Sequence, residues 1–481
     1  MGAYQELEQH FTKISLLGDV TGVLAWDCAV WMPPGGAAAR SAQMALLRVM
    51  QHELTISPML SDLLEKVEAQ DLDFWQRANL CEMRRICNHA RALPSELVKA
   101  NSEACADCEV SWRQARAENN FNLVAEKLVR VVAFAREIAH IKAEVLGVLP
   151  YDALLDQFEP GLRQADIHPL FAAYSAFFPE LLEAALLNNK PLPQLHGSFA
   201  TQKQQALCQD VMSVMGFDFN HGRLDVSTHP FCGGIPSDIR MTTRYDEVSF
   251  VSALMGVIHE TGHALYEMGL PEKWRNQPVG KARGMVMHES QSLFWEMQIG
   301  RGESFLTRLE GKIEEHLGQR IPLTTLKALY NHVEPSFIRV DADEITYPAH
   351  IILRYTLEKA LLSGDLLVPD LPSAWDDQLE KLLALRPKNQ GEGCLQDIHW
   401  YDGAIGYFPT YSLGAMAAAQ LKAAYDQEQG DEDLKAVLCW LRDSVHTRAS
   451  SASMAQIIKD ATGQALSIEP FMAHLKERYL N

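Results

Sequence analysis

The stretch LMGVIHETGHALYEMGL, residues 254–270, places two histidines within an otherwise apolar helical pattern. His259 and His263 lie four positions apart, so on an α-helix they share one face with their Cβ atoms about 5–6 Å apart. Two imidazoles at this spacing can bind one Zn²⁺ through Zn–N bonds of about 2.0–2.1 Å. Glu260 lies one position round the helix, where its carboxylate can take a proton from water instead of binding the metal. The stretch therefore predicts a helix that carries the metal site of a zinc hydrolase, with a peptidase as the favoured class.

A catalytic zinc needs a third protein ligand and one open position. Glu289 offers this ligand, because it lies 26 residues after His263 within a second helical pattern, Met285–Gly300. That separation allows a turn and a returning helix beside the first. His288 would point about 100° away from Glu289 round its helix.

Other residues near the motif are interpreted as supporting residues and not as metal ligands. Glu267 lies one turn beyond His263 and is better placed as a partner that fixes an imidazole than as a metal ligand. Glu296 is interpreted as a solvated or packing residue. Gly262 is small, so we expect substrate to pass close to the helix there. The structural alternative for the whole motif is a core helix that carries two hydrogen-bonded histidines.

Composition limits the class of protein. The chain has 481 residues, enough for a large core, with 47% hydrophobic and 22% charged residues. Its formal net charge of −19 argues against nucleic acid as a partner, because phosphate binding needs a basic stripe. No run of about 18 uncharged apolar residues is found, so we expect neither a transmembrane helix nor a membrane partner. The segment Met1–Gly18 is typical of an amphipathic helix and not of a signal peptide, which makes a cytoplasmic location the default expectation.

The nine cysteines are expected to be reduced thiols, because no secretory signal accompanies them. Cys105 and Cys108 have CxxC spacing but lack a second pair of Cys or His ligands. We interpret this motif as structural or incidental.

Helical periodicity dominates the chain and predicts a mainly α fold, a large helical body with a small β-sheet near the zinc site. No linker or repeat divides residues 1–481, so we expect one domain, either undivided or with two lobes flanking a groove. The strand candidates are Phe217–Phe219, Leu224–Ser227 and Met241–Tyr245, with the Gly/Pro-rich stretch Cys232–Pro236 among them. The main helical patterns are Ala37–Ile56, Leu123–Val148, Leu170–Leu187, Gln202–Met215, Leu254–Leu270, Met285–Gly300, Ala349–Leu362, Gly414–Gln427 and Asp433–Leu441.

Seven motifs follow one another in an order that resembles the carboxypeptidase Taq family, the M32 metallocarboxypeptidases. They run through most of the chain and are far more specific together than HExxH alone. They are Met32–Gly36 (MPPGG), His229–Phe231 (HPF), Asp238–Thr242 (DxRxT), His259–His263 (HExxH), His288–Gln291 (HESQ), Ile338–Asp343 (IRxxAD) and Gly393–Trp400 (GxxQDxHW).

The resemblance implies a mostly helical homodimer with a deep substrate groove, and a gluzincin-like zinc site of HExxH plus Glu at its floor. Such enzymes release single residues from the free C-termini of peptides, with broad specificity and poor tolerance of C-terminal proline. One Zn²⁺ per chain is expected, held by His259, His263 and Glu289, with Glu260 as the general base. Co²⁺ could occupy the same ligands.

A carboxypeptidase must also bind the free carboxylate of its substrate, for which the planar fork of an arginine is suited. The candidates are Arg240, Arg339 and Arg354. The family motif favours Arg339, whose structural alternative is an internal ion pair with Asp341 or Asp343. Arg240 can instead pair with Asp238.

Four further residues are candidates for substrate binding. His229 and His399 could contact the substrate backbone or carboxylate, or could be structural histidines. Tyr407 or Tyr411 could donate a hydrogen bond to the oxyanion that forms during hydrolysis, or could pack beside Phe408. Asp397 is interpreted as an orienting partner and not as a catalyst.

Two other classes of function remain open at this point. The first is a zinc aminopeptidase or oligoendopeptidase with the same ligands, although no GxMEN-like acidic motif for an α-amine is found. The second is a helical protein that keeps a zinc or peptide groove without turnover.

Overall fold

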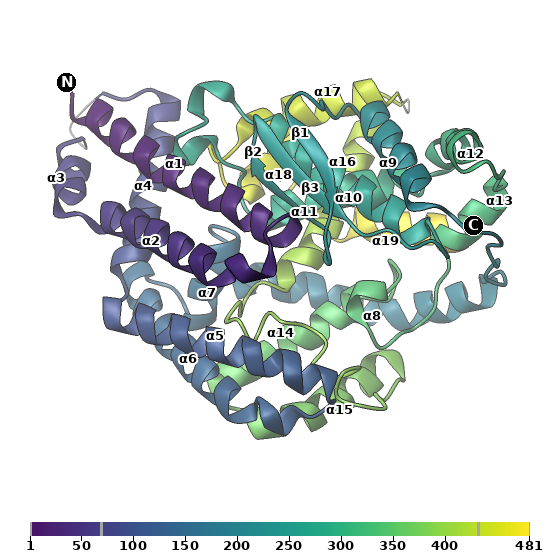
Figure 1. Ribbon diagram of the computed structural model, residues 1–481, viewed down its shortest axis with the longest axis horizontal. Helices are drawn as coiled ribbons and strands as arrows, with labels where there is room; N and C mark the ends of the chain where they lie inside the picture. Colours follow the sequence, from purple (N-terminus) through teal and green to yellow (C-terminus); the bar gives the residue numbers. More distant parts are fainter. Residues whose placement is uncertain (1, 68–70, 431–432, 481) are drawn as a thin grey trace. The chain divides into compact units, whose positions relative to one another are not determined.

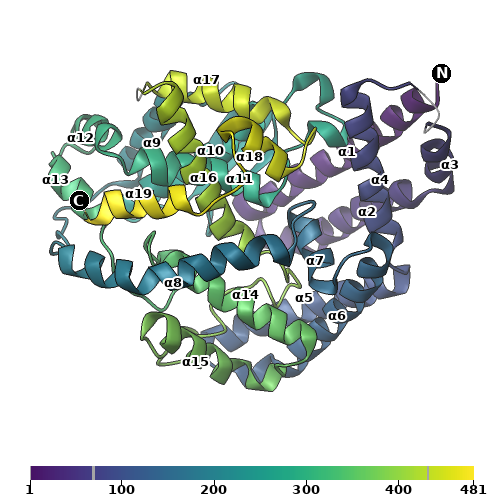
Figure 2. The same ribbon diagram turned by 180° about the vertical axis from the view of Figure 1, so that it is seen from behind.

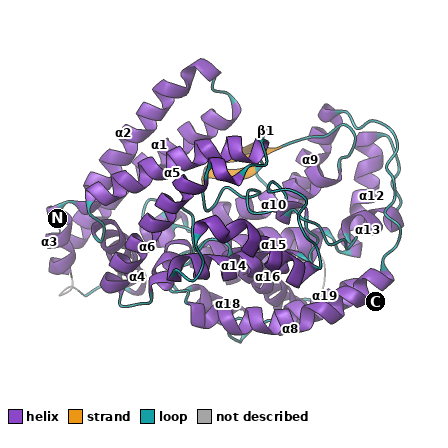
Figure 3. Cartoon of the chain, turned by 90° about the horizontal axis from the view of Figure 1, so that it is seen from below, coloured by secondary structure: helices purple, strands orange, loops and turns teal. Residues whose placement is uncertain are grey.

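The computed structural model describes residues 2–67, 71–430 and 433–480. Most of these residues are helical, and three short strands form one small sheet among them (Figure 3). The predicted fold class, mainly α with a small sheet, is therefore confirmed. The chain folds into two compact units, each with its own network of internal contacts. Unit 1 comprises Met1–Ala90, Pro191–Tyr330 and Ala417–Leu466, and unit 2 comprises Arg91–Lys190, Asn331–Met416 and Ser467–Asn481.

Unit 1 contains the sheet and the helices that surround it. Its helices are α1 (Ala3–Val30), α2 (Ala37–Ile56), α3 (Pro58–Val67), α4 (Phe74–Arg91, whose last residue falls in unit 2), α9 (Thr201–Met215), α10 (Val251–Met268), α11 (Met285–Leu293), the π-helix Phe294–Gly300, α12 (Glu303–Leu317), α13 (Leu323–Tyr330), the larger part of α16 (Pro409–Glu428), α17 (Leu434–Ser444) and α18 (Met454–Thr462).

The sheet has the strand order β1-β3-β2. Strand β3 (Asp238–Thr243) pairs parallel with β1 (Gly222–Val226) and antiparallel with β2 (Phe231–Ile235). The sequence predicts β1 and β3 approximately but misses β2, which occupies the Gly/Pro-rich stretch. Gly234 explains this, because its φ of +96° is open mainly to glycine, and an added Cβ would lie 2.1 Å from the carbonyl oxygen of Asp238. The glycine that argues against a strand is the residue that lets the β2–β3 hairpin close.

The predicted strand Phe217–Phe219 is wrong. This segment follows α9, and the backbone N–H of Phe217 donates to the carbonyl of Met212 at the end of that helix. The rings of Phe217 and Phe219 pack edge to face with their centroids 4.9 Å apart. The two rings pack against each other just after α9, and neither residue belongs to the sheet.

Helix α10 forms the centre of unit 1. Both β2 and β3 pack against it, as do α9 and α11 (Figure 1). Its buried side chains lie on several sides of the helix, as expected for an element enclosed by neighbours. They include Leu254, Val257, Ile258, Ala264 and Leu265.

Gly262 allows α11 to approach α10 closely. An added Cβ would lie 2.6 Å from both the carbonyl oxygen of Gln291 and the Cα of Ser292, two backbone atoms of α11. Our expectation that substrate passes over Gly262 is therefore wrong, because Gly262 is buried beneath another helix. The small residue sets the spacing between two helices.

The N-terminal segment is an amphipathic helix, as predicted, but it extends well beyond residue 18. Helix α1 runs from Ala3 to Val30 and packs along α2 (Figure 3). Its buried residues Leu7, Phe11 and Ile14 follow the spacing of one helical face.

Unit 2 is helical throughout its regular elements. These are α5 (Ser95–Ala117), α6 (Ala125–Leu146), α7 (Pro150–Phe158), α8 (Gln164–Asn188), α14 (Tyr347–Ser363), α15 (Leu371–Leu383), the first part of α16 and α19 (Glu469–Leu480). Helix α19 runs beside α8 (Figure 2), and the ring of Phe471 packs against that of Tyr174 with a centroid distance of 6.0 Å. Cys105 and Cys108 both lie on α5, and no disulfide joins any two cysteines of the described residues.

Helix α8 is the one described helix that is long and apolar enough to pass a length and composition test for a membrane span. Our sequence criterion of uncharged residues did not select it, because Asp166, Glu180 and Glu183 interrupt it. It contains two prolines, and its buried face packs against α19 and α14. In its most apolar window 28% of the residues are buried, and a single helix of this kind is weak evidence for a membrane span.

Replacing Gly262 by Ala tests the close approach of α10 and α11. The new Cβ must displace backbone atoms of α11, so we expect the free energy of unfolding to fall by about 1–3 kcal/mol. Gly256→Ala on the same helix is the matched control, because nothing lies within 4 Å of its added Cβ. Helix propensity then favours Ala over Gly by about 1 kcal/mol. Thermal and urea unfolding would measure both, and equal effects would contradict the packing role of Gly262.

Candidate metal centre

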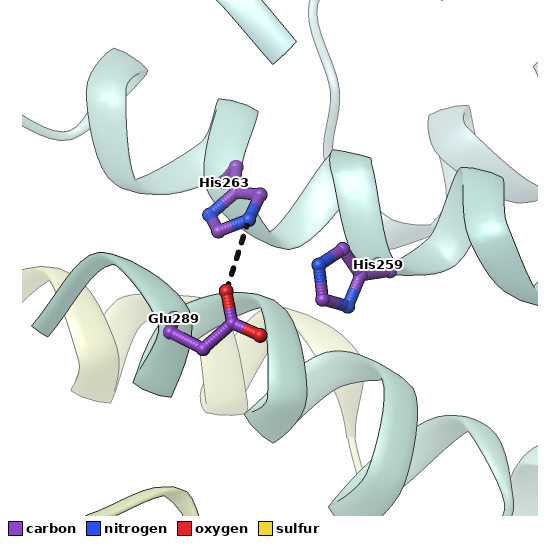
Figure 4. A group of neighbouring side chains, drawn as sticks. All are labelled: His259, His263 and Glu289. Atoms are coloured by element: carbon purple, nitrogen blue, oxygen red, sulfur yellow. Dashed lines mark ion pairs between the residues drawn. The ribbon is translucent and has the colours of Figure 1, made fainter. Parts of the chain in front are cut away.

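Two helices of unit 1 bring the three predicted ligands together. His259 and His263 lie on α10, and Glu289 lies on the neighbouring α11 (Figure 4). One nitrogen of each ring and one carboxylate oxygen all lie within 4.8 Å of one another. The Nε2 atom of His263 is 3.7 Å from Oε2 of Glu289. The close packing of the two helices at Gly262 makes this convergence possible.

The donor set fits a catalytic zinc ion. Two imidazoles and one carboxylate are a known three-ligand set, which leaves a fourth position open. Ligand atoms on a tetrahedral zinc lie about 3.4 Å apart, close to the His263–Glu289 distance. Burial alone would lower the pKa of His259, but its hydrogen bond to Glu296 and the charges of Glu289, Glu296 and Glu260 raise this pKa to about 10. The centre therefore stabilises positive charge strongly.

Glu296 orients the first imidazole. Its Oε2 lies 2.9 Å from Nδ1 of His259, and its Oε1 accepts a hydrogen bond of 2.7 Å from Nη2 of Arg301. Burial tends to raise the pKa of Glu296, but Arg301 and His259 lower it overall. Glu296 is thus a mostly buried anion with two partners, and our interpretation of it as a solvated or packing residue is wrong.

The π-helix that continues α11 carries Glu296. The backbone N–H of Arg301 donates to the carbonyl of Glu296, five residues earlier, which is the π-helical pattern. Glu296 follows Glu289 by seven positions, so both carboxylates face α10. This spacing was the sequence signal that could have revealed its role. Since α10 and α11 run in opposite directions, Glu289 meets His263 and Glu296 meets His259.

The second imidazole has a different environment. Nδ1 of His263 lies 2.6 Å from Nδ1 of His288, and Nε2 of His288 lies 2.9 Å from Oε1 of Glu267. Glu267 thus contacts an imidazole, but it is that of His288, which lies between Glu267 and His263. His288 does point to a different side of α11 than Glu289, yet that side still faces α10. Burial keeps the pKa of His263 well below its usual range, so His263 is neutral.

Glu260 lies beside the ligands. Burial raises its pKa to about 7, the charge of His259 opposes this rise, and that of Glu289 adds to it. A carboxylate with a pKa near the working pH is suited to exchange protons. Glu260 therefore stays a candidate general base, adjacent in sequence to His259.

His229 and Arg240 lie at the sheet of unit 1. The ring of His229 is exposed, and its carbonyl accepts hydrogen bonds from the hydroxyls of Ser227 and Thr242. Thr242 also accepts from the N–H of Phe231 at 3.1 Å, so the DxRxT strand holds the HPF segment. Arg240 pairs with Asp238, as the sequence suggested, with Nη2 and Oδ2 2.8 Å apart. Its guanidinium also lies 4.3 Å from the ring centroid of Trp26.

Unit 2 contains a buried cluster built on Asp397. The Nη2 of Arg339 lies 2.8 Å from Oδ1 of Asp397, while Nε of Arg354 lies 2.7 Å from Oδ2. Burial would raise the pKa of Asp397, but the two guanidinium groups hold it well below its usual range. Asp397 is thus an orienting partner, as interpreted, and it replaces Asp341 and Asp343 as the ion-pair partner of Arg339.

The remaining candidates surround Arg339. Nη1 of Arg339 donates to the hydroxyl of Tyr347 at 2.7 Å, and its guanidinium lies 5.0 Å from the ring centroid of Tyr411. Nε2 of His399 lies 3.3 Å from the hydroxyl of Tyr411, and the Tyr407 ring lies 5.2 Å from that of Tyr411. Burial lowers the pKa of His399 to about 4, with Asp397 opposing, so this ring is neutral. Arg339, His399, Tyr407 and Tyr411 therefore form one cluster of cationic and neutral donors.

A second group of possible ligands fits a metal poorly. Asp210, Glu315 and His316 lie near one another, but the ammonium of Lys312 lies 2.7 Å from Oδ2 of Asp210. A cation of the protein already neutralises this carboxylate. The group on α10 and α11 is the better candidate.

Comparison with known proteins places the chain in a family. The sequence profile of the carboxypeptidase Taq (M32) metallopeptidases matches residues 6–479. Thermostable carboxypeptidase 1 of Thermus thermophilus is 36% identical, over 99% of this chain and 98% of that protein. Metallocarboxypeptidase 1 of Trypanosoma cruzi has a TM-score of 0.97 at 38% identity, over 100% of this chain and 99% of that one. The M32 carboxypeptidase of Deinococcus radiodurans R1 has a TM-score of 0.94 at 30% identity, over 99% and 98%. With its motifs, its fold and these relatives in agreement, the chain belongs to the carboxypeptidase Taq (M32) metallopeptidase family and is a metallocarboxypeptidase.

Proposed function

We propose that this metallocarboxypeptidase is zinc-dependent and that His259, His263 and Glu289 hold one Zn²⁺ per chain. The observation that carries the proposal is the convergence of their donor atoms within 4.8 Å beside Glu260. The mixed nitrogen and oxygen donor set suits zinc, and it would also accept Co²⁺. Metal analysis of the purified protein tests the identity of the ion.

Glu260 acts as the general base in this proposal. A bound zinc ion supplies Lewis acidity, which makes water more acidic and polarises a carbonyl group. Glu260 takes the proton from the attacking water and then delivers it to the leaving amine. Burial and the neighbouring Glu289 hold its pKa at about 7, which lets one carboxylate perform both transfers near neutral pH.

Arg339 and its neighbours bind the substrate end in this proposal. A guanidinium held by Asp397 and Tyr347 is pre-oriented and needs little reorganisation to meet a carboxylate. The hydroxyls of Tyr411 and Tyr407 and the neutral ring of His399 supply further hydrogen-bonding groups. In unit 1, His229 and Arg240 contribute to binding of the peptide.

The family likeness supports the remaining features of the proposal. We infer peptides with a free C-terminus as substrates, broad specificity and poor tolerance of C-terminal proline. We also infer a homodimer in the cytoplasm, with peptides bound in a groove and with neither nucleic acid nor membrane as a partner. The net charge of −19 is consistent with these partner assignments.

Glu260→Gln tests the general base. Removing a general base typically slows catalysis about 10²–10⁴-fold. We therefore expect kcat to fall at least about 10²-fold while zinc stays bound. Metal analysis and peptide hydrolysis measure the two effects separately. Glu272→Gln, at an exposed site, is the control and should keep wild-type activity. Full activity in Glu260→Gln would rule out Glu260 as the base.

Amidation of the substrate's C-terminus tests whether the enzyme acts at that end of the peptide. A peptide with a free C-terminus should lose single residues in sequence, whereas its C-terminal amide should be nearly resistant, because the amide lacks the charge that Arg339 would bind. Mass spectrometry of a peptide ladder reads the result. Equal cleavage of both peptides contradicts C-terminal recognition, and release from the N-terminus would indicate an aminopeptidase.

Arg339→Lys tests the assignment of the carboxylate-binding residue. Lysine keeps the positive charge beside Asp397 but loses the planar fork. A lost charged hydrogen bond of about 1.5–3 kcal/mol corresponds to a fall of roughly 10–150-fold in kcat/KM for free-acid peptides. We expect the change mainly in KM. Arg240→Lys gives the comparison, and a larger rise in KM for that variant would transfer the role to Arg240.

A further inference from the structure

Two imidazoles on one helix face the candidate metal position, but the Nδ1 atoms of the two rings have different hydrogen-bond partners. His259 meets a carboxylate directly, at 2.9 Å from Glu296. His263 meets another imidazole, at 2.6 Å from His288, and a carboxylate follows only beyond it. We propose that His288 is the positioning residue of His263, and that Glu267 acts on His263 only through His288. This inference rests on the proposed zinc site.

The direction of each hydrogen bond follows from the pairing. Nε2 of His263 faces Glu289, so a metal bound there leaves the imidazole proton on Nδ1. That N–H must donate, and Nδ1 of His288 must accept. The proton of a neutral His288 then lies on Nε2, from which it donates to Oε1 of Glu267 at 2.9 Å. Each of the two ring nitrogens of His288 thereby has one defined role, Nδ1 as an acceptor and Nε2 as a donor.

The surroundings of His288 keep this arrangement in place. Its ring lies 4.6 Å from that of His263 and 5.5 Å from that of Tyr266, measured between centroids. The side chains of His288 and Glu267 are 18% and 23% exposed. A mostly buried ring that contacts two aromatic neighbours has little freedom to rotate away from His263. His288 precedes Glu289, so α11 supplies both a proposed ligand and the partner that orients another.

The arrangement has a consequence for metal affinity. A hydrogen bond to the second nitrogen fixes the tautomer and the ring orientation of a ligating histidine, and its loss typically weakens metal binding about 10–100-fold. We therefore expect His288→Leu to weaken zinc binding by this factor. His288→Asn should lose much less, because its side-chain oxygen can accept a hydrogen bond near the position of Nδ1. Comparing the two variants separates the effect of losing the hydrogen-bond acceptor from the effect of losing the ring.

A double-mutant cycle tests whether Glu267 acts through His288. Glu267→Leu alone should weaken zinc binding, because it releases the Nε2 side of the His288 ring. In the His288→Leu background, Glu267→Leu should cause no further loss of zinc affinity, since the ring that connects Glu267 to His263 is already absent. Additive losses would show an independent action of Glu267 and would overturn this part of the inference.

The experiment measures the dissociation constant of Zn²⁺ for each metal-depleted full-length variant, by competition with a chromophoric chelator. Thermal unfolding of the metal-free variants identifies any that fail to fold, and KM at saturating zinc should stay near the wild-type value. His221→Leu is the control, because it removes a histidine–aspartate pair from an exposed position of unit 1. It should leave zinc affinity unchanged.

His263→Leu distinguishes a failure of this inference from a failure of the proposed site. Loss of zinc binding in His263→Leu, with wild-type affinity in His288→Leu, would overturn the role of His288 and leave the site intact. An equal loss in His288→Leu and His288→Asn would overturn its role as a hydrogen-bond acceptor. Unchanged zinc affinity in His263→Leu would overturn the ligand assignment itself and the inference with it.

Discussion

The close packing of α10 against α11 is the constraint on which the candidate metal centre depends. Gly262 has no side chain, so the backbone of α11 at Gln291 and Ser292 can approach within the distance that a Cβ would occupy. Glu289 lies two residues before Gln291 on α11 and reaches His263. A bulkier residue at 262 would move the carboxylate away from both histidines. The geometry of three proposed ligands thus rests on one glycine.

Buried charge organises the same pair of helices. Glu289 and Glu296 both extend from the α11 segment towards α10, and Glu260 adds a third carboxylate. Three carboxylates in a buried space repel one another unless positive charge lies among them. Arg301 neutralises part of this charge at Glu296. The charges of Glu289, Glu296 and Glu260 also raise the pKa of His259, so the carboxylates favour a cation where the imidazoles converge.

Unit 2 shows the opposite arrangement, with two guanidinium groups around one carboxylate. Asp397 accepts from both Arg339 and Arg354, and aromatic rings lie against the two arginines. A buried Asp between two arginines stays ionised and fixes the planes of both forks. Arg354 has no exposed side-chain surface, so its role is structural, while Arg339 lies beside the partly exposed Tyr411 and His399. The net positive charge of this cluster suits an anionic end group.

The sequence by itself determined the helical class, the HExxH helix, the third candidate ligand and the family, because each depends on local spacing or on ordered motifs. Periodicity also located α2 and most of α10 and α14. Only the tertiary structure decided the roles of Glu296, His288 and Gly262, and the partner of Arg339. Those roles depend on which side chains meet across different elements, and spacing along one helix cannot specify that. Strand β2 was missed for the same reason, since its glycines become favourable only when the hairpin with β3 closes.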